Sequence, residues 1–295
     1  MRIAVASGKG GTGKTTVAVS MALSLMTDDA SDGGTRYPPL FLDCDVEAPD
    51  AHLFLRPTIE ETAEASVLVP TVDESRCTLC GLCADVCEYN ALAVLGDEVL
   101  LFPELCHGCG SCSLICPERA ISEGPRTVGR LEAGHAGELR FARGVLNVGE
   151  PMPVPVIRQL KAWARPQPGQ LSILDAPPGT SCPMVEVVHD ADFVLLVTEP
   201  TPFGLHDLQL AVEVVRELGL AAAVVINRDG IGDRGVDDLC ASEDLPILLR
   251  IPFDRCVAEG LARGATLLDV RPEYRDRLRE LVRSVAERVL VGEPG

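Results

Sequence analysis

The chain has 295 residues, of which 46% are hydrophobic and 4% aromatic, and its 44 acidic and 26 basic side chains give a formal net charge of −18. This length allows one sizeable core and one small additional domain. The negative charge repels nucleic-acid phosphates, and no stretch approaches the roughly 20 continuous apolar residues that span a bilayer, so neither a nucleic-acid partner nor stable membrane insertion is expected.

Continuous apolar runs bounded by turn residues predict buried parallel strands. These runs cover residues 3–6, 40–42, 171–174, 193–197, 222–226 and 247–251. Helical patterns lie between or after them, at residues 15–26, 205–218 and 272–290. The alternation predicts a doubly wound, mainly parallel α/β sheet with right-handed crossovers. The interval from 42 to 171 is too long for one crossover and therefore predicts an insertion.

The segment SGKGGTGKTT, residues 7–16, follows the first strand and satisfies G-x-x-x-x-G-K-[ST] before a helix. Backbone N–H groups of such a turn, together with the helix start, bind phosphate oxygens. Lys14 is expected to reach the β and γ phosphates, and Thr15 to bind Mg²⁺. The motif therefore predicts ATP or ADP with Mg²⁺ as ligands, held by Gly8, Gly10, Gly11, Thr12, Gly13, Lys14, Thr15 and Thr16.

Acidic residues follow two further predicted strands. Asp43 and Asp45 come after the second strand, and Asp175 ends a later one, four residues before Gly179. Because the carboxyl ends of parallel strands meet at one edge of a sheet, these acids and the phosphate-binding loop are expected to form a single site. The polar segment 28–39, DDASDGGTRYPP, predicts a surface loop.

Eight cysteines lie between positions 77 and 116, in two runs of the form C-x-x-C-x-x-C-x-x-x-C that are offset by 29 residues. Pro117 follows the second run, whereas Glu88 follows the first. The spacing is typical of bacterial ferredoxins with two [4Fe–4S] clusters, in which each fourth cysteine ligates the other cluster. One cluster is therefore assigned Cys77, Cys80, Cys83 and Cys116, and the other Cys106, Cys109, Cys112 and Cys87.

Two other uses of these cysteines fit the sequence less well. Structural zinc normally takes two cysteines per knuckle with a longer gap between the pairs. Disulfides are less expected still, because no apolar signal peptide precedes the first strand and a reducing, cytoplasmic location is predicted.

These features predict three sequence segments. An ATPase domain occupies residues 1–69 and 125–295, and a ferredoxin-like α+β domain is inserted at 70–124. Alternating residues with several glycines at 127–148 predict one or two hairpins that return to the sheet. The C-terminal helix at 272–290 is expected to pack on the sheet, because its apolar face lacks the aromatic residues of membrane-surface helices.

The order of the motifs, and the loop K-G-G-x-G-K-T-T in particular, resembles the MinD, ParA and Mrp superfamily of deviant-Walker P-loop ATPases, here with an inserted ferredoxin domain. The resemblance implies that Lys9 crosses a two-fold dimer interface to the partner's ATP. It also implies that Asp45 orients the attacking water, that Asp43 and Asp175 support Mg²⁺, and that Gly179 senses the γ-phosphate.

The same resemblance extends to adenine recognition. Ile226-Asn227-Arg228 and Ile251-Pro252-Phe253-Asp254 look like the strand ends that contact the base in this superfamily. The residues that it assigns to the adenine site are Asn227, Arg228, Pro252 and Phe253.

The leading hypothesis is a cytoplasmic ATPase that forms a homodimer when ATP is bound and thereby controls electron transfer or cluster exchange with a protein partner. The first alternative is an assembly carrier that delivers clusters to apoproteins. The second is a positioning ATPase of the MinD or ParA type, in which the clusters are structural or sense redox state.

Overall fold

The computed structural model describes residues 1–26 and 38–291. The surface loop predicted at 28–39 therefore lies outside the described residues, apart from its last two positions.

A nine-stranded sheet forms the centre of the molecule, in the order β11-β10-β9-β1-β8-β2-β7-β6-β3. Seven of these strands run parallel, including β7 (Leu139–Leu146) beside β2. The other six correspond to the predicted apolar runs: β1 (Arg2–Ala6), β2 (Leu40–Asp43), β8 (Ser172–Asp175), β9 (Phe193–Thr198), β10 (Ala222–Asp229) and β11 (Ile247–Pro252). They are buried because helices cover both faces of the sheet. The predicted mainly parallel α/β fold is confirmed.

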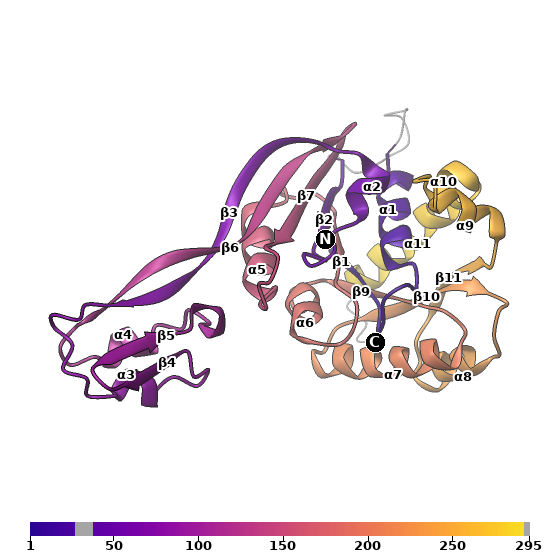
Figure 1. The fold of residues 1–295 in the computed structure, drawn as a ribbon. Coiled ribbons are helices and arrows are strands. Elements are labelled where there is room, and N and C mark those ends of the chain that lie inside the picture. Colours follow the sequence, from indigo (N-terminus) through magenta and orange to yellow (C-terminus); the bar gives the residue numbers. More distant parts are fainter. Residues whose placement is uncertain (27–37, 292–295) are drawn as a thin grey trace.

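Helices form one layer on each face of this sheet (Figure 1). One apolar core lies under α5 (Val154–Trp163), α6 (Cys182–Val188), α7 (Pro202–Glu217) and α8 (Gly235–Ser242). The other core lies under α1 (Lys14–Ser24), α2 (Ala51–Leu55), α10 (Leu267–Val270) and α11 (Tyr274–Val291), with α9 (Arg255–Leu261) at the edge. Strand side chains alternate between the two cores, so each parallel strand contributes to both.

The C-terminal helix α11 packs on the sheet as predicted. Leu278 and Val285 are fully buried in the second core. Arg275 and Arg279 donate hydrogen bonds to carbonyl oxygens at the C-terminal end of α1, among them Arg279 Nε to Ser24 O at 2.7 Å. Cations at a helix C-terminus stabilise its free carbonyls, so α11 fixes the helix that follows the glycine-rich loop.

Two long strands carry the chain away from the central sheet. β3 (Thr58–Val72) and β6 (Ile121–Ala136) pair antiparallel from Thr58–His135 to Val72–Ile121 and form what is called here the ribbon. The inner part of β6 also pairs with β7 (Leu139–Leu146), and β7 pairs with β2. The hairpins predicted at 127–148 are therefore present as the β6–β7 hairpin.

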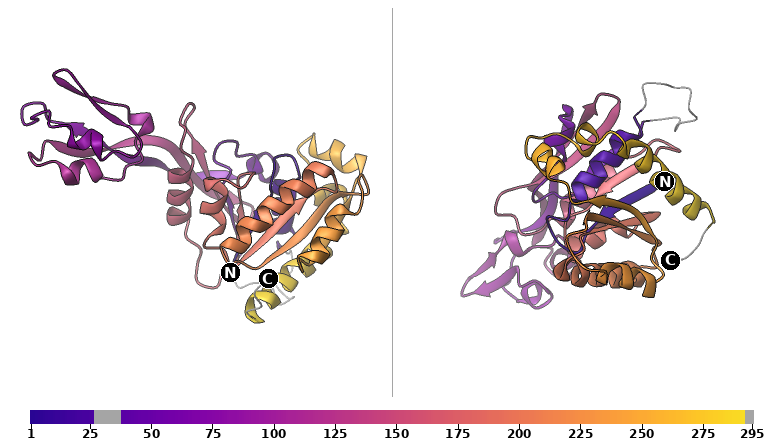
Figure 2. Two further views of the ribbon diagram at one scale, coloured as in Figure 1. Left: turned by 90° about the horizontal axis from the view of Figure 1, so that it is seen from below. Right: turned by 90° about the vertical axis from the view of Figure 1, so that its right-hand side faces the viewer.

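Residues 70–124, called here the lobe, lie at the outer end of the ribbon and project from the body of the molecule (Figures 1 and 2). The lobe contains α3 (Leu82–Asp85), β4 (Leu92–Leu95), β5 (Glu98–Leu101), η1 (Pro103–Leu105) and α4 (Ser111–Ile115). The predicted domain boundaries at 69/70 and 124/125 fall inside β3 and β6, so the chain enters and leaves the lobe without a linker.

The lobe is an internal repeat in three dimensions as well as in sequence. In the β4–β5 hairpin Leu92 pairs with Leu101. In the ribbon Ile121, 29 residues after Leu92, pairs with Val72, 29 residues before Leu101. Gly81 and Gly110 precede the two short helices, both in the left-handed conformation. The two cysteine runs therefore occupy equivalent backbone frameworks.

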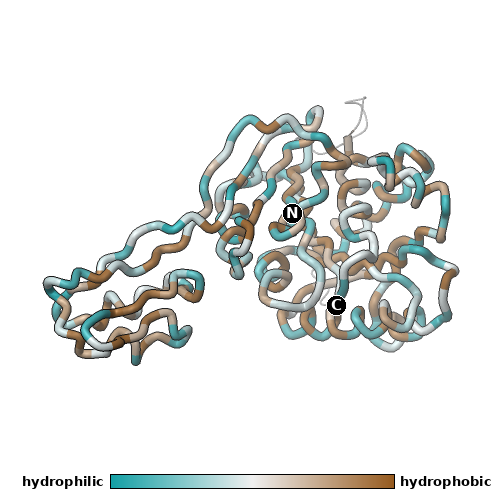
Figure 3. Tube along the Cα trace, in the orientation of Figure 1, coloured by the Kyte–Doolittle hydropathy of each residue, from teal (hydrophilic) through white to brown (hydrophobic). Residues whose placement is uncertain are grey.

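Hydrophobic segments are found on the projecting lobe as well as in the central sheet (Figure 3). Within the described ranges 1–26 and 38–291, no helix combines the length and apolar character needed to cross a membrane.

Candidate functional site

The glycine-rich loop lies between β1 and α1 at the carboxyl edge of the sheet. Gly11 and Gly13 have φ values of 80° and 92°, which favour glycine. A Cβ at Gly8 would lie 2.0 Å from the carbonyl oxygen of Asp207, so this position admits no side chain. The loop is thus open on its inner side for a ligand and closed on its outer side by α7.

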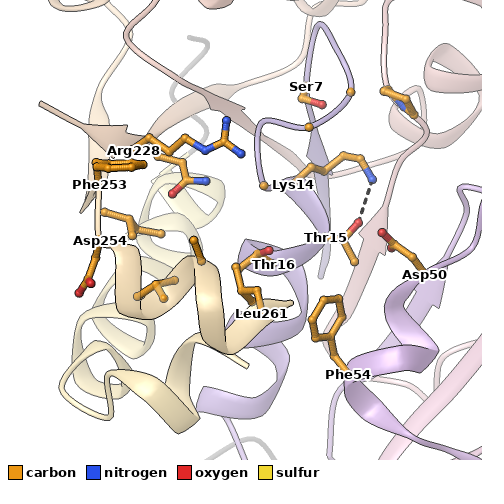
Figure 4. Close-up of a pocket in the computed structure, with 18 of the residues that line it drawn as sticks. Ser7, Lys14, Thr15, Thr16, Asp50, Phe54, Arg228, Phe253, Asp254 and Leu261 are labelled. Atoms are coloured by element: carbon orange, nitrogen blue, oxygen red, sulfur yellow. Dashed lines mark hydrogen bonds between the residues drawn. The ribbon is translucent and has the colours of Figure 1, made fainter. Parts of the chain in front are cut away.

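A cavity of about 420 Å³ opens beside this loop (Figure 4). Its lining includes most of the predicted nucleotide residues, namely Gly10, Gly11, Gly13, Lys14, Thr15, Thr16, Asp45, Asn227, Arg228, Pro252 and Phe253. The phosphate loop and the four residues assigned to adenine therefore face one space, although β10 and β11 lie at the far edge of the sheet from β2. Gly8, Lys9, Thr12, Asp43, Asp175 and Gly179 are not among the lining residues.

Lys14 lies at the base of the cavity and is paired with acidic side chains. Its Nζ lies 2.7 Å from Asp175 Oδ1 and 3.9 Å from Asp45 Oδ2. Burial favours the neutral amine, but the charge and hydrogen bond of Asp175, together with the charges of Asp45 and Asp43, outweigh it, so the pKa of Lys14 is raised. The ammonium group is thus held in its charged form, ready to bind phosphate oxygens.

Asp175 and Asp50 each present an oxygen suited to a magnesium shell. Within the part of the chain that the structure describes, Asp175 Oδ2 and Asp50 Oδ1 are buried and have no hydrogen-bond partner. Burial also raises the pKa of Asp175, despite the opposing charge of Lys14. Buried carboxylate oxygens without partners are unfavourable unless a cation or its water shell joins them, so these residues and Thr15 fit Mg²⁺.

Asp43 and Asp45 differ in their surroundings. Both carboxylate oxygens of Asp43 accept backbone hydrogen bonds, from Asp45 N at 3.3 Å and from Ala51 N at 3.1 Å. Asp43 therefore joins the end of β2 to the start of α2 and is fully buried. Asp45 faces the cavity, and burial raises its pKa to about 6.

Lys9 is not among the residues that line the cavity, and it forms an ion pair within its own chain. Its Nζ lies 2.5 Å from Oε1 of Glu199, and the other oxygen of Glu199 lies 2.7 Å from Arg228 Nη1. Although burial disfavours the charged carboxylate, Lys9 and then Arg228 hold the pKa of Glu199 below its usual value. Glu199 was not predicted from the sequence, although its position just after β9 matches that of the acids after β2.

Two further contacts arrange the loop. Asn227 Nδ2 donates to Thr12 O at 2.7 Å, and a Cβ at Gly13 would lie 2.2 Å from the same Nδ2 atom. Gly179, with a φ of 93°, donates its N–H to Ser7 O at 2.9 Å. Asn227 and Gly179 therefore contact the backbone of the phosphate loop from opposite sides of β1.

Sequence reasoning also missed Phe54, Asp254 and Leu261, which line the cavity. Phe54 is carried by α2, a helix of five residues whose pattern is too short to predict. Asp254 is the last residue of the Ile251–Asp254 motif, from which no role was predicted for it. Its carboxylate accepts the Cys256 N–H at the start of α9.

The eight cysteines of the lobe line two separate cavities. Cys77, Cys80, Cys83 and Cys116 line the first cavity, and Cys87, Cys106, Cys109 and Cys112 line the second. Each is a small cavity of about 20 Å³, compared with about 420 Å³ for the nucleotide cavity. This grouping has the same membership as the two ligand sets assigned from the sequence, with the fourth cysteine of each run in the other cavity.

The two sets of four thiols match the number of ligands that a [4Fe–4S] cluster takes. Backbone N–H groups of Ala91 and Ala120 donate to Cys87 Sγ at 3.2 Å and Cys116 Sγ at 3.3 Å, and hydrogen bonds to sulfur tune the potential of a bound cluster. Among residues 1–26 and 38–291, no three Cys, His, Asp or Glu side chains converge closely enough to hold a metal ion. The grouping of the thiols around the two cavities is thus the observation that bears on the cluster ligands.

Comparison with known proteins gives a consistent picture. The model of the CobQ/CobB/MinD/ParA nucleotide binding domain family matches residues 3–267. Two proteins of Methanocaldococcus jannaschii are similar over nearly their whole length. Uncharacterized protein MJ0579 is 28% identical, with 99% of this chain and 98% of that protein covered, and MJ0578 is 30% identical, with 97% of each covered.

Solved structures share the fold at lower identity. The cell division ATPase MinD of Pyrococcus furiosus is 20% identical, with 96% of this chain and 98% of that chain covered and a TM-score of 0.52. The septum site-determining protein MinD of Pyrococcus horikoshii, solved with Mg-ADP, is 19% identical, with coverage of 96% and 95% and a TM-score of 0.54.

The raised pKa of Asp45 generates a prediction for the nucleotide-free protein. A carboxyl group whose folded-state pKa lies near 6, above its ordinary value of 3.8, costs stability once it is ionised. This cost is absent at low pH and appears as pH rises from about 4 through 6. At pH 8 we expect Asp45→Asn to raise the free energy of unfolding by up to about 3 kcal/mol, measured by urea denaturation.

The control for this experiment is Glu47→Gln, which neutralises an exposed acid two residues away. The gain from Asp45→Asn should vanish at pH 4, whereas Glu47→Gln should change little at either pH. A gain that is independent of pH would show that burial of the ionised Asp45 carboxylate is not its cause.

Proposed function

We propose, because the chain belongs to the CobQ/CobB/MinD/ParA nucleotide binding domain family, that it is an ATP-hydrolysing iron–sulfur protein. In this proposal, nucleotide-driven homodimerisation is coupled to electron transfer or cluster exchange through two [4Fe–4S] clusters in the lobe, which has a ferredoxin-like form. The protein partner is a redox protein or a recipient of clusters.

The nucleotide part of the proposal rests on the cavity beside the glycine-rich loop. Lys14 binds the β and γ phosphates in place of its present partner Asp175. Asp175 and Thr15 would hold Mg²⁺, while Asp43 would support the magnesium shell indirectly by holding the β2–α2 turn. Asp45, whose pKa of about 6 leaves it mostly ionised at neutral pH, orients the attacking water. The base packs between Asn227, Arg228, Pro252 and Phe253.

The cluster part rests on the grouping of the cysteines. Clusters bound in the two cavities would supply one-electron redox chemistry within a range of roughly −700 to +450 mV. Cys83 and Cys112 are buried beside Leu92 and so shield the inner side of each cavity, whereas Cys80 and Cys109 are exposed. Each cavity therefore has one protected side and one side that a partner can approach.

The observation that carries the proposal is the short path between the two sites. Phe54 on α2 lines the nucleotide cavity, and β3 begins at Thr58, only four residues later. From Thr58 the ladder between β3 and β6 runs without a linker to Val72, which lines the first cysteine cavity. A shift of α2 on nucleotide binding would therefore move the base of the ribbon that carries the lobe.

Lys9 is the remaining catalytic candidate. In the proposal it leaves Glu199 in the ATP-bound dimer and reaches the nucleotide of the partner subunit. A cation supplied in trans is worth on the order of 10³ to 10⁵ in rate in related phosphoryl transfers.

A positioning ATPase is the second candidate, because the family model that matches residues 3–267 includes MinD and ParA. The fold is also shared with MinD over at least 95% of both chains. The two cysteine cavities have no part in positioning as such, so this candidate requires their clusters to be structural or to sense redox state.

The grouping of the cysteines predicts a pattern of iron loss. After anaerobic reconstitution, Cys87→Ser and Cys109→Ser should each remove about half of the bound iron, because both remove a ligand of the second cluster. The double variant of Cys87→Ser with Cys109→Ser should retain about the same half of the iron, which belongs to the first cluster. Combining Cys87→Ser with Cys80→Ser should remove nearly all the iron, since both clusters lose a ligand. Equal iron contents in the two double variants would contradict the cross-ligation.

The role of Lys9 predicts complementation between two inactive variants. Lys9→Ala should keep ATP binding but lose roughly 10³-fold in hydrolysis rate, whereas Lys14→Ala should fail to bind ATP. When the two are mixed, a dimer of one subunit of each has one bound ATP and one intact Lys9 in the facing subunit. Recovery of ATPase activity on mixing is therefore expected. Activity that stays at the level of the separate variants would show that Lys9 does not act in trans.

A further inference from the structure

The two halves of the lobe differ at one backbone position that the repeat makes equivalent. Gly108, in the second cysteine run, has a φ of 66°, and Leu79, its counterpart in the first run, has a φ of 56°. A Cβ at Gly108 would lie 2.9 Å from the carbonyl oxygen of Leu68 in β3, so only glycine fits there. At Leu79 the same conformation is adopted by a large apolar residue.

Leu79 therefore keeps a strained conformation. The left-handed region is unfavourable for a non-glycine residue, and glycine would adopt it freely. Among the described non-glycine residues with positive φ, Leu79 is the only apolar one; the others are Arg56, Asn90, Arg119, Arg228 and Asp244. Backbone strain of this kind often marks a functional position.

The surroundings of Leu79 indicate what that function is. Leu79 lines the first cysteine cavity next to Cys80, and more than a third of its surface is exposed. Leu82 and Leu95 follow the lining residues Gly81 and Val94 in the chain and are 42% and 65% exposed. This cavity lies beyond Val72 and Ile121, the last pair of the ribbon, whereas the second cavity is lined by Leu68 and Pro70 of β3. The first cavity is thus the outer one.

Charge around the outer cavity has one dominant sign. Residues 70–124 contain nine acidic and two basic side chains. The exposed acids in the first half of the lobe and beside its cavity are Asp73, Glu74, Asp85, Glu88, Asp97, Glu98 and Glu118. The two basic residues, Arg76 and Arg119, are exposed at the same end, and Arg76 Nη2 donates to Glu118 O at 2.7 Å, so the acids still outnumber them. An apolar centre with a charged rim is the usual composition of a transient docking surface, and an acidic rim attracts a basic partner.

We propose that the outer end of the lobe, with Leu79 as its apolar anchor, is the surface on which a redox protein with a basic docking face exchanges one electron. This inference rests on the proposed function, since it requires a cluster in the first cavity. A reduced cluster held by Cys77, Cys80, Cys83 and Cys116 would supply one electron, and a one-electron acceptor on the docked partner would take it. The second cavity is then the inner member of the pair.

Reduction of cytochrome c, a basic redox protein, provides the test. Reconstituted protein reduced with dithionite and freed of excess reductant is mixed with ferric cytochrome c in a stopped-flow instrument, and each ferric haem takes one electron. Leu79→Gly should lower the second-order rate constant about tenfold, because the partner loses a leucine contact in the docked complex. The rate with the small dye dichlorophenolindophenol, which needs no docking surface, should be unchanged, as should the visible spectrum of the clusters.

Two further variants make the test specific. Leu79→Asn, which tolerates the left-handed conformation, should reproduce the loss without the added freedom of glycine. Leu114→Asn alters a side chain that is 90% exposed in the other half of the lobe and should leave the rate unchanged. A wild-type rate in both Leu79 variants, or an equal loss in Leu114→Asn, would overturn the inference. Failure of the wild-type protein to form clusters would instead contradict the proposed function.

Discussion

The antiparallel ladder between β3 and β6 is the constraint on which the architecture of this molecule depends. At its inner end β6 pairs with β7, which pairs with β2, so the ribbon is an extension of the central sheet. At its outer end the last pairs belong to the lobe and repeat the register of the β4–β5 hairpin. Because both strands cross the boundary without interruption, the lobe has no flexible tether. Movement at the base of the ribbon is therefore passed to the lobe by the ladder itself.

The nucleotide site lies close to the base of the ribbon, and its charged side chains pair with one another. Lys14 is paired with Asp175, and Asp175 still has one buried oxygen without a hydrogen bond. A buried ion pair of this kind contributes little net stability by itself, because desolvation offsets the attraction. Replacing the Lys14–Asp175 pair by contacts of Lys14 with phosphate and of Asp175 with Mg²⁺ would therefore cost little free energy. The same exchange acts on the turn between β2 and α2, since Asp43 joins that turn and Asp45 and Asp50 face the cavity from it.

Much of this organisation could be predicted from the sequence because its signals are local. The apolar strands, the glycine-rich loop and the cysteine spacing each specify their structure within about ten residues. Glu199 could not be found in this way, since its importance comes from Lys9 and Arg228, which lie far from it in the chain. The ribbon was missed because β3 and β6 lack clean alternation where they leave the sheet, and their pairing is a long-range property. The Leu79 conformation became visible only when the two halves of the lobe were compared in three dimensions.

The central claim is that nucleotide state reaches the clusters through α2 and the ribbon. It is tested most directly by measuring the reduction potentials of the reconstituted clusters, by titration monitored with electron paramagnetic resonance, in the presence of Mg-ADP and of a non-hydrolysable ATP analogue. The account predicts that the potential of at least one cluster differs between the two nucleotides, and that the difference disappears in Lys14→Ala. Identical potentials with both nucleotides in the wild-type protein, under conditions where binding is saturated, would contradict it.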